Sequence, residues 1–141
     1  MQPGTDGPYT HADFERMALA EFPELREEFE QDPGLLHLHM HAFQRLAERA
    51  QRVGDWQRYD RCMRVAHELW RRPDDALLNA LNVSFLEHLE FRGVQGEVAW
   101  TYLTPELQEG WRAMQAYMAR LAELAKPPRK QRPAKPRRRR R

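Results

Sequence analysis

The chain has 141 residues, of which 41% are hydrophobic and 31% are charged, a composition typical of one globular domain. No apolar stretch approaches the roughly 20 residues that a bilayer-spanning helix needs, and the polar first ten residues do not resemble a secretory signal, so we expect neither a membrane protein nor a secreted one. The single cysteine, Cys62, excludes an internal disulfide and a cysteine-based metal site and favours a cytoplasmic location.

The formal net charge of +2 conceals a strong asymmetry along the chain. Residues 126–141 contain ten Lys or Arg and no acidic residue, whereas residues 1–125 contain 13 basic and 21 acidic residues, a balance of −8. Prolines and mutually repelling cations cannot build a core, which predicts a disordered basic tail over 126–141. We therefore expect a flexible N-terminus over 1–9, an all-helical domain over 10–125 and the basic tail.

A capping pattern predicts the first helix. Thr10 and Asp13 form a capping-box-like start, and apolar residues follow at helical spacing up to residue 22. Pro23 lacks an amide hydrogen and is tolerated in the first turn of a helix, so a second short helical segment is predicted over 23–31. The pattern indicates a short, bent pair of helices.

Two longer amphipathic helices are predicted next. Apolar residues recur every three or four positions over 36–53 and again over 56–70, with only Gly54 and Asp55 between them. A break of two residues folds two amphipathic helices back on each other, so an antiparallel hairpin is expected.

The following region predicts a buried helix and a loop. Asp74 and Asp75 precede a helix from 76 to about 91, whose apolar residues cover more than one face, so we expect it to be central and buried. Residues 92–103, which include Gly93 and Gly96, predict an irregular or short-helical loop that folds back on the core.

The last predicted helix begins at Thr104 and Pro105, which supply a side-chain cap and a proline in the first turn. Its apolar positions are expected to continue the buried seam to the end of the domain at residue 125. These positions are Leu107, Trp111, Met114, Met118, Leu121 and Ala125.

The hairpin over 40–73 resembles a tetratricopeptide repeat, a helix-turn-helix unit of about 34 residues. Tyr59 departs from that pattern, because the family usually has a small residue there. The resemblance implies tetratricopeptide-like hairpins within a compact helical bundle. It rests on Phe43, Leu46, Ala47, the turn Gly54-Asp55-Trp56, Ala66 and Pro73.

Over about residues 11–124 the chain also resembles an uncharacterised bacterial family of small all-helical proteins, a domain of unknown function. The resemblance rests on Glu21-Phe22-Pro23-Glu24-Leu25, on the stretch over 79–89, and on Thr104-Pro105-Glu106-Leu107. It implies a helical fold and supplies no activity.

Three histidines, His37, His39 and His41, are candidate metal ligands. His37 and His41 lie one helical turn apart, with His39 between them, and could bind a divalent cation if a third ligand came from elsewhere. The nearest residues on that face, Gln44 and Glu48, are weak candidates, and no His-Glu-x-x-His signature is present. We therefore favour a solvated polar face and predict neither a metal site nor a cofactor.

Glu87, His88 and Glu90 form a second cluster within the predicted apolar helix, where a general acid or base is conceivable. The two carboxylates share a side of the helix, His88 points elsewhere, and no motif supplies a nucleophile. We favour structural roles and predict no catalytic residue. An enzymatic hypothesis would require a polar cleft that opens onto these three side chains.

Cys62 and the four tryptophans are expected to have structural roles. Cys62 lies beside an apolar stripe without an adjacent base, which predicts a half-buried, unreactive thiol. All four tryptophans fall at or near seam positions and are expected in the core.

The basic tail is the strongest deviation from an ordinary composition. Its cations would attract phosphate backbones without sequence preference and in a salt-dependent way. The alternatives are a passive solubility tail, or one that folds onto its own acidic domain. No apolar segment accompanies the charge, so a membrane surface is not expected. The predicted anion-binding residues are Lys126, Arg129, Lys130, Arg132, Lys135, Arg137, Arg138, Arg139, Arg140 and Arg141.

These observations predict a non-enzymatic interaction module, in which an acidic helical domain binds another protein and the tail adds nonspecific affinity for anions or nucleic acid. The alternative is an immunity or antitoxin-type inhibitor whose acidic domain covers a basic partner. Removal of the tail distinguishes these two hypotheses. The interaction module would lose affinity for anions or nucleic acid, whereas the inhibitor would still bind its partner.

Overall fold

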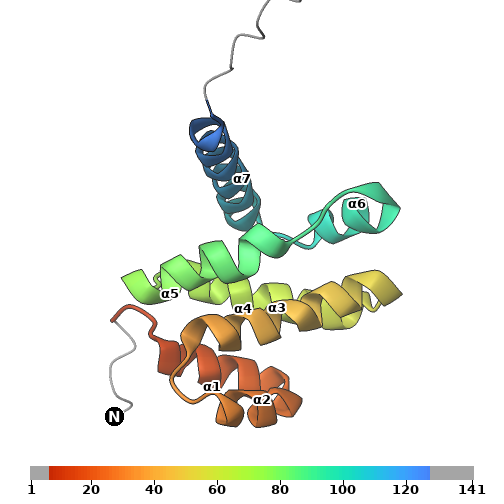
Figure 1. Cartoon of the computed structure of the whole chain (residues 1–141). Helices are drawn as coiled ribbons and strands as arrows, with labels where there is room; N and C mark the ends of the chain where they lie inside the picture. The colour runs from red at the N-terminus through yellow and green to blue at the C-terminus, as the bar shows by residue number, and fades with distance from the viewer. Residues whose placement is uncertain (1–6, 128–141) are drawn as a thin grey trace, which may run out of the picture.

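The computed structural model describes residues 7–127 and confirms the all-α fold (Figure 1). The predicted segments 1–9 and 126–141 therefore lie largely outside the described residues. The helices are α1 (His11–Glu21), α2 (Arg26–Gln31), α3 (Leu36–Val53), α4 (Trp56–Trp70), α5 (Asp75–Ala80), α6 (Gly93–Thr101) and α7 (Pro105–Ala125), with a 3-10 turn η1 (Pro23–Leu25), a π-helical segment η2 (Leu81–Phe85) and a second 3-10 turn η3 (Leu86–His88).

Local capping fixes the start of α1 as predicted. The Thr10 amide donates to the Asp13 carboxylate at 2.8 Å, and the Asp13 amide donates to the Thr10 hydroxyl at 3.3 Å. Tyr9, which lies just before the expected domain, is held against the turn between α4 and α5. Its backbone amide donates to the Arg72 carbonyl at 2.7 Å, and its carbonyl accepts from the Asp74 amide at 2.8 Å.

The helices form layers around the hairpin of α3 and α4. Figure 1 shows α1 and α2 on one side of this hairpin and α5 with the segments after it on the other. Gly54 ends α3 in the left-handed conformation, with φ of 74°, which a residue with a Cβ rarely adopts. Phe43 joins the layers, because its ring lies 5.7 Å from that of Phe14 on α1 and 5.4 Å from that of Phe85.

The predicted buried helix over 76–91 is shorter and less regular than expected. The α-helical part ends at Ala80, after which a π-helical segment and a 3-10 turn lead to extended backbone at Leu89. Apolar residues on several faces of one regular helix cannot all face the same core, and the wider π turn changes their direction. Leu81, Phe85 and Leu89 are buried as a result.

The predicted loop over 92–103 contains a helix, α6. Gly96 makes this possible, because a Cβ at that position would lie 2.1 Å from the backbone carbonyl carbon of Phe91. The ring of Trp100 then packs edge-on at 4.9 Å from that of Phe91 and at 5.4 Å from that of Trp111 on α7. The segment thus folds back on the core, as expected, and takes the short-helical of the two expected forms.

Candidate interaction surface

The outer half of α7 extends beyond the helical layers. Thr104 caps the helix by accepting from the Leu107 amide at 3.3 Å, and the side chains of Leu107 and Met114 are buried. Beyond Met114 no described side chain of α7 is fully buried. The expected seam is therefore wrong at its end, because Leu121 and Ala125 are exposed: the other layers do not reach that part of the helix.

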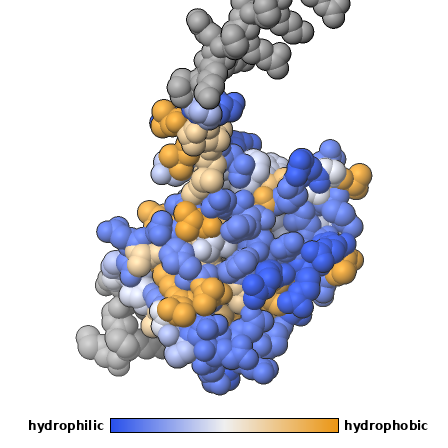
Figure 2. All heavy atoms as spheres, in the orientation of Figure 1, coloured by the Kyte–Doolittle hydropathy of each residue, from blue (hydrophilic) through white to orange (hydrophobic). Residues whose placement is uncertain are grey.

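Three large side chains form an exposed apolar stripe on this part of the helix. Tyr117, Leu121 and Leu124 follow one another at i, i+4 and i+7, so they share one face, and they are 52%, 41% and 76% exposed. Figure 2 shows hydrophobic residues along α7 where it leaves the rest of the molecule. We call these three residues the outer stripe.

The basic tail follows the outer stripe directly in the sequence. Lys126 is the one residue of the predicted anion-binding set within residues 7–127, and its ammonium group pairs with the Glu123 carboxylate at 3.2 Å. The other nine cations lie outside the described residues. An apolar helix face and ten cations are thus contiguous along the chain.

A second exposed apolar group lies where α3 and α5 begin. Leu35, Leu38 and Leu78 are 51%, 48% and 38% exposed. They form part of the surface of the main helical layers, whereas the outer stripe lies on a single projecting helix.

The predicted solvated face holds for His37, which is exposed, and in part for His41, which is half-buried, but not for His39. His39 is 1% exposed and belongs to the core side of α3. The ring of His37 contacts the Ser84 hydroxyl at 2.8 Å, and that of His41 stacks at 5.3 Å from the ring of His88. Burial, with the nearby positive charge of Arg45, lowers the pKa of His41. The structure therefore separates His37 and His41 from His39, which meets residues of α1 instead.

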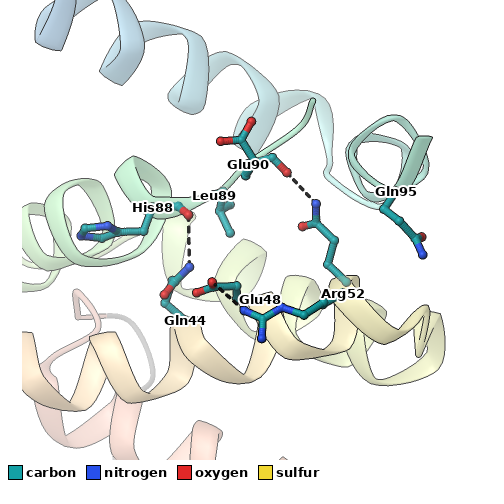
Figure 3. Close-up of a pocket in the computed structure, with 8 residues that line it drawn as sticks. Gln44, Glu48, Arg52, His88, Leu89, Glu90 and Gln95 are labelled. Carbon is teal, nitrogen blue, oxygen red and sulfur yellow. Dashed lines mark hydrogen bonds and ion pairs between the residues drawn. The ribbon is translucent and has the colours of Figure 1, made fainter. Parts of the chain in front are cut away.

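A pocket of about 310 Å³ lies between α3 and the segment that follows η3 (Figure 3). The Gln44 side chain donates to the His88 carbonyl at 3.2 Å, and that of Gln51 donates to the Glu90 carbonyl at 2.6 Å. In Figure 3 the His88 ring and the Glu90 carboxylate point away from this pocket. His88 and Glu90 therefore border the pocket with their backbone, and its other lining residues are Gln44, Glu48, Gln51, Arg52, Leu89 and Gln95.

The Glu90 carboxylate pairs with Arg92, whose Nε donates to it at 2.6 Å, and these hydrogen bonds lower the pKa of Glu90. A carboxylate held in its charged form by arginine is a poor general acid or base near neutral pH. The pocket does not receive the His88 ring or the Glu90 carboxylate, and Glu87 does not line it, so it is not the polar cleft onto which all three side chains would open.

Cys62 is buried more completely than expected, with no exposed surface. Burial raises the pKa of its thiol to about 12. The four tryptophans are partly buried and pack against the core, where Trp56 stacks on Tyr102 at 5.6 Å between ring centres.

Sequence reasoning missed His11 and Glu15, whose side chains meet His39 at the start of α1. The available signal was their spacing of four residues on a predicted helix, which places them on one face.

Membrane-spanning character and similarity to known proteins also bear on the function of the chain. Within residues 7–127, no helix combines the length and the apolar character needed to cross a membrane. No curated protein and no solved structure matches the chain. The model of one protein family matches residues 16–119, from the middle of α1 to the outer half of α7. The chain therefore belongs to the family described as a domain of unknown function, DUF7674.

Proposed function

We propose that the chain is a non-enzymatic protein-binding module in which α7 docks into an apolar groove of a partner and the basic tail contacts anionic groups beside that groove. The observation that carries this proposal is the exposed outer stripe, Tyr117, Leu121 and Leu124, at the end of a projecting helix that leads directly into ten cations.

The stripe fits the helix-in-groove mode of recognition. In that mode apolar side chains at i, i+3 or i+4, and i+7 enter successive pockets of a groove. Full burial of one leucine side chain contributes about 1.5–3 kcal/mol. Leu124, at 76% exposed, has most of this surface available, and Tyr117 can keep its hydroxyl at the rim.

The tail defines the chemistry of the partner. Ten cations attract carboxylates or phosphates and release counterions on contact, so the partner's groove is expected to carry an acidic rim. Affinity should therefore have an apolar part, which depends on the outer stripe, and an electrostatic part that salt weakens.

The proposal also includes three expectations from the sequence analysis, which concern the hairpin, the family and the location. The hairpin of α3 and α4 is interpreted as tetratricopeptide-like, the family as bacterial, and the location as cytoplasmic. The immunity or antitoxin-type alternative rests on the balance of −8 over residues 1–125 and assigns binding to the helical domain rather than to α7.

A matched pair of variants tests the outer stripe. Leu121→Ser/Leu124→Ser removes two apolar side chains, and Ala119→Ser/Ala122→Ser introduces the same hydroxyls on the opposite, exposed side of α7. Each immobilised protein is incubated with a lysate of the source cells at two salt concentrations. Bound proteins are quantified by mass spectrometry, alongside wild type, Leu38→Ser and a chain that ends at Ala125.

We expect a partner recovered by wild type and by the Ala119/Ala122 variant to decrease at least tenfold with the Leu121/Leu124 variant. Recovery should also decrease after tail removal and at high salt. Equal recovery by the Leu121/Leu124 variant would refute the proposal. Binding that survives tail removal but is lost in Leu38→Ser would move the surface to the helical domain, as the alternative predicts.

A further inference from the structure

Three potential metal ligands meet where α1 and α3 begin. His11 and Glu15 are one turn apart on α1, and His39 comes from the first turn of α3. The His11 Nε2 atom lies 3.1 Å from the Glu15 carboxylate oxygen and 2.9 Å from the His39 Nδ1 atom. The third side of the triangle, from His39 Nδ1 to the same Glu15 oxygen, is also 2.9 Å.

The hydrogen bonds of His39 fix which nitrogen faces this triangle. Its Nε2 atom lies 2.7 Å from the Asp32 carbonyl and 3.1 Å from the Phe29 carbonyl, and both of these groups only accept. Nε2 therefore carries a proton, and in the neutral ring the Nδ1 lone pair points at His11 and Glu15. Metal-binding histidines are oriented in this same way, with the second ring nitrogen donating to a carbonyl or carboxylate.

The contact between His39 and Glu15 can be bridged by a cation, either a proton on His39 Nδ1 or a metal ion. With Nε2 protonated, a neutral His39 ring presents a lone pair to a carboxylate oxygen that is also an acceptor, and the two atoms are 2.9 Å apart. A proton on His11 Nε2 would donate to one of these two acceptors and would leave the contact between them unchanged. A divalent ion above one face of the triangle, about 2.0–2.2 Å from each corner, would accept electron pairs from all three atoms at once.

We propose that His11, Glu15 and His39 bind one divalent transition-metal ion, Zn²⁺ in the first instance. The ligands are His11 Nε2, a Glu15 carboxylate oxygen and His39 Nδ1, and water completes the coordination. Bonds of about 2.0–2.2 Å to such ligands place neighbouring donors about 3.4 Å apart at tetrahedral angles and about 3 Å apart at angles of about 90–100°. The observed sides of 2.9–3.1 Å lie within about 0.5 Å of both spacings, so no large movement of the helices is needed.

The surroundings suit a site that is closed on one side and open on the other. His39 is buried and its ring stacks at 4.5 Å on that of Phe29, so its position is fixed by the core. The side chains of His11 and Glu15 are 26% and 34% exposed, which leaves a path for the ion and its water ligands. The bound ion would link α1 to α3, and its loss should loosen that contact.

The experiment uses the full-length chain, stripped of metal by dialysis against a chelator. Zn²⁺ binding is measured by calorimetry, and Co²⁺ is added separately because its visible absorption reports the coordination geometry. We expect one ion per chain and a higher melting temperature with Zn²⁺. His11→Gln and Glu15→Gln should each weaken binding at least tenfold. Both positions are partly exposed, so circular dichroism should show the wild-type helical content.

The matched control is the double variant His37→Gln/His41→Gln, which removes the pair that sequence spacing alone favours and should bind Zn²⁺ as wild type does. The proposal is overturned if the wild type shows no saturable Zn²⁺ binding, if both His11→Gln and Glu15→Gln bind as tightly as wild type, or if the control variant loses binding. The Leu121→Ser/Leu124→Ser variant should also bind Zn²⁺ normally, so this result is independent of the proposed docking of α7.

Discussion

Replacement of Gly96 by alanine would place a methyl group within the backbone of the preceding segment. An ideal Cβ at this position lies 2.1 Å from the Phe91 carbonyl carbon, 2.4 Å from its oxygen and 2.6 Å from its Cα. These are backbone atoms, so no rotamer change can relieve the overlap. Either α6 moves away from Phe91, or the extended segment before it shifts.

The expected cost follows from two opposing terms. Alanine is favoured over glycine in a helix interior by about 1 kcal/mol. Overpacking of a close contact typically costs about 1–3 kcal/mol, and a contact with rigid backbone belongs at or above the upper end of that range. We therefore expect Gly96→Ala to lower the free energy of unfolding by about 2 kcal/mol, and the melting temperature by about 10 °C.

Gly110 supplies the comparison, because a Cβ there would lie 2.7 Å from the Trp70 ring, which can rotate away. Gly110→Ala should change stability by less than about 1 kcal/mol, since the helix-propensity gain offsets the displaced ring. Urea titrations followed by circular dichroism measure both variants. Tryptophan fluorescence reports separately on the Trp100 cluster against α7. A Gly96→Ala protein within about 0.5 kcal/mol of wild type would refute the close backbone contact.

Three further predictions concern buried and paired polar groups. The Tyr59 hydroxyl is buried without a hydrogen-bond partner within the described chain. Tyr59→Phe should therefore raise the free energy of unfolding by about 1 kcal/mol, and a clear loss of stability in urea titration would contradict this. Burial raises the pKa of Cys62 to about 12, so the thiol should not react with a disulfide reagent at pH 8 until urea unfolds the protein. Rapid labelling of the native protein would show instead that the thiol is accessible. The Tyr9 hydroxyl donates to the Glu68 carboxylate at 2.5 Å and lowers the pKa of that carboxyl below its ordinary value of 4.5. The pair therefore stabilises the folded protein above about pH 4.5, and this stabilisation is lost as the pH falls through the pKa that Glu68 has in the folded state. Tyr9→Phe should therefore reduce the loss of stability between pH 7 and pH 3, and an unchanged acid titration would argue against the pairing.

Helix starts were predictable wherever a side chain caps its own helix. Thr10, Asp55 and Thr104 each accept a hydrogen bond from the amide three residues later, and all three starts lie where the sequence places them. Such bonds join neighbours in the chain, so sequence spacing is sufficient to identify them. The π-helical segment and α6 depend instead on contacts between segments, such as that of Gly96 with the Phe91 backbone, and no local pattern encodes those contacts.

The histidines show how spacing can select the wrong face. At about 100° per residue, His37 and His41 lie on one side of α3, and His39 lies about 200° round from His37. His39 falls three residues after Leu36, on the side that the apolar stripe marks as the core. Its burial was therefore implied by the sequence. Its approach to His11, 28 residues away, required the packing of α1 on α3.

The outer half of α7 is the opposite case, because its apolar pattern is clear but the rest of residues 7–127 leaves that face exposed. Helical periodicity shows that one face of a helix is apolar, but not whether that face is buried. Met114 is buried and Leu121 is exposed although both belong to the same apolar pattern, because the other helical layers extend only as far as Met114. A helix needed only for its own core gains nothing from leucines beyond the last layer, where they cost solubility and favour aggregation. Two leucines and a tyrosine on one face of two further turns, followed at once by ten cations, are therefore the residues to which the proposed docking of α7 assigns binding.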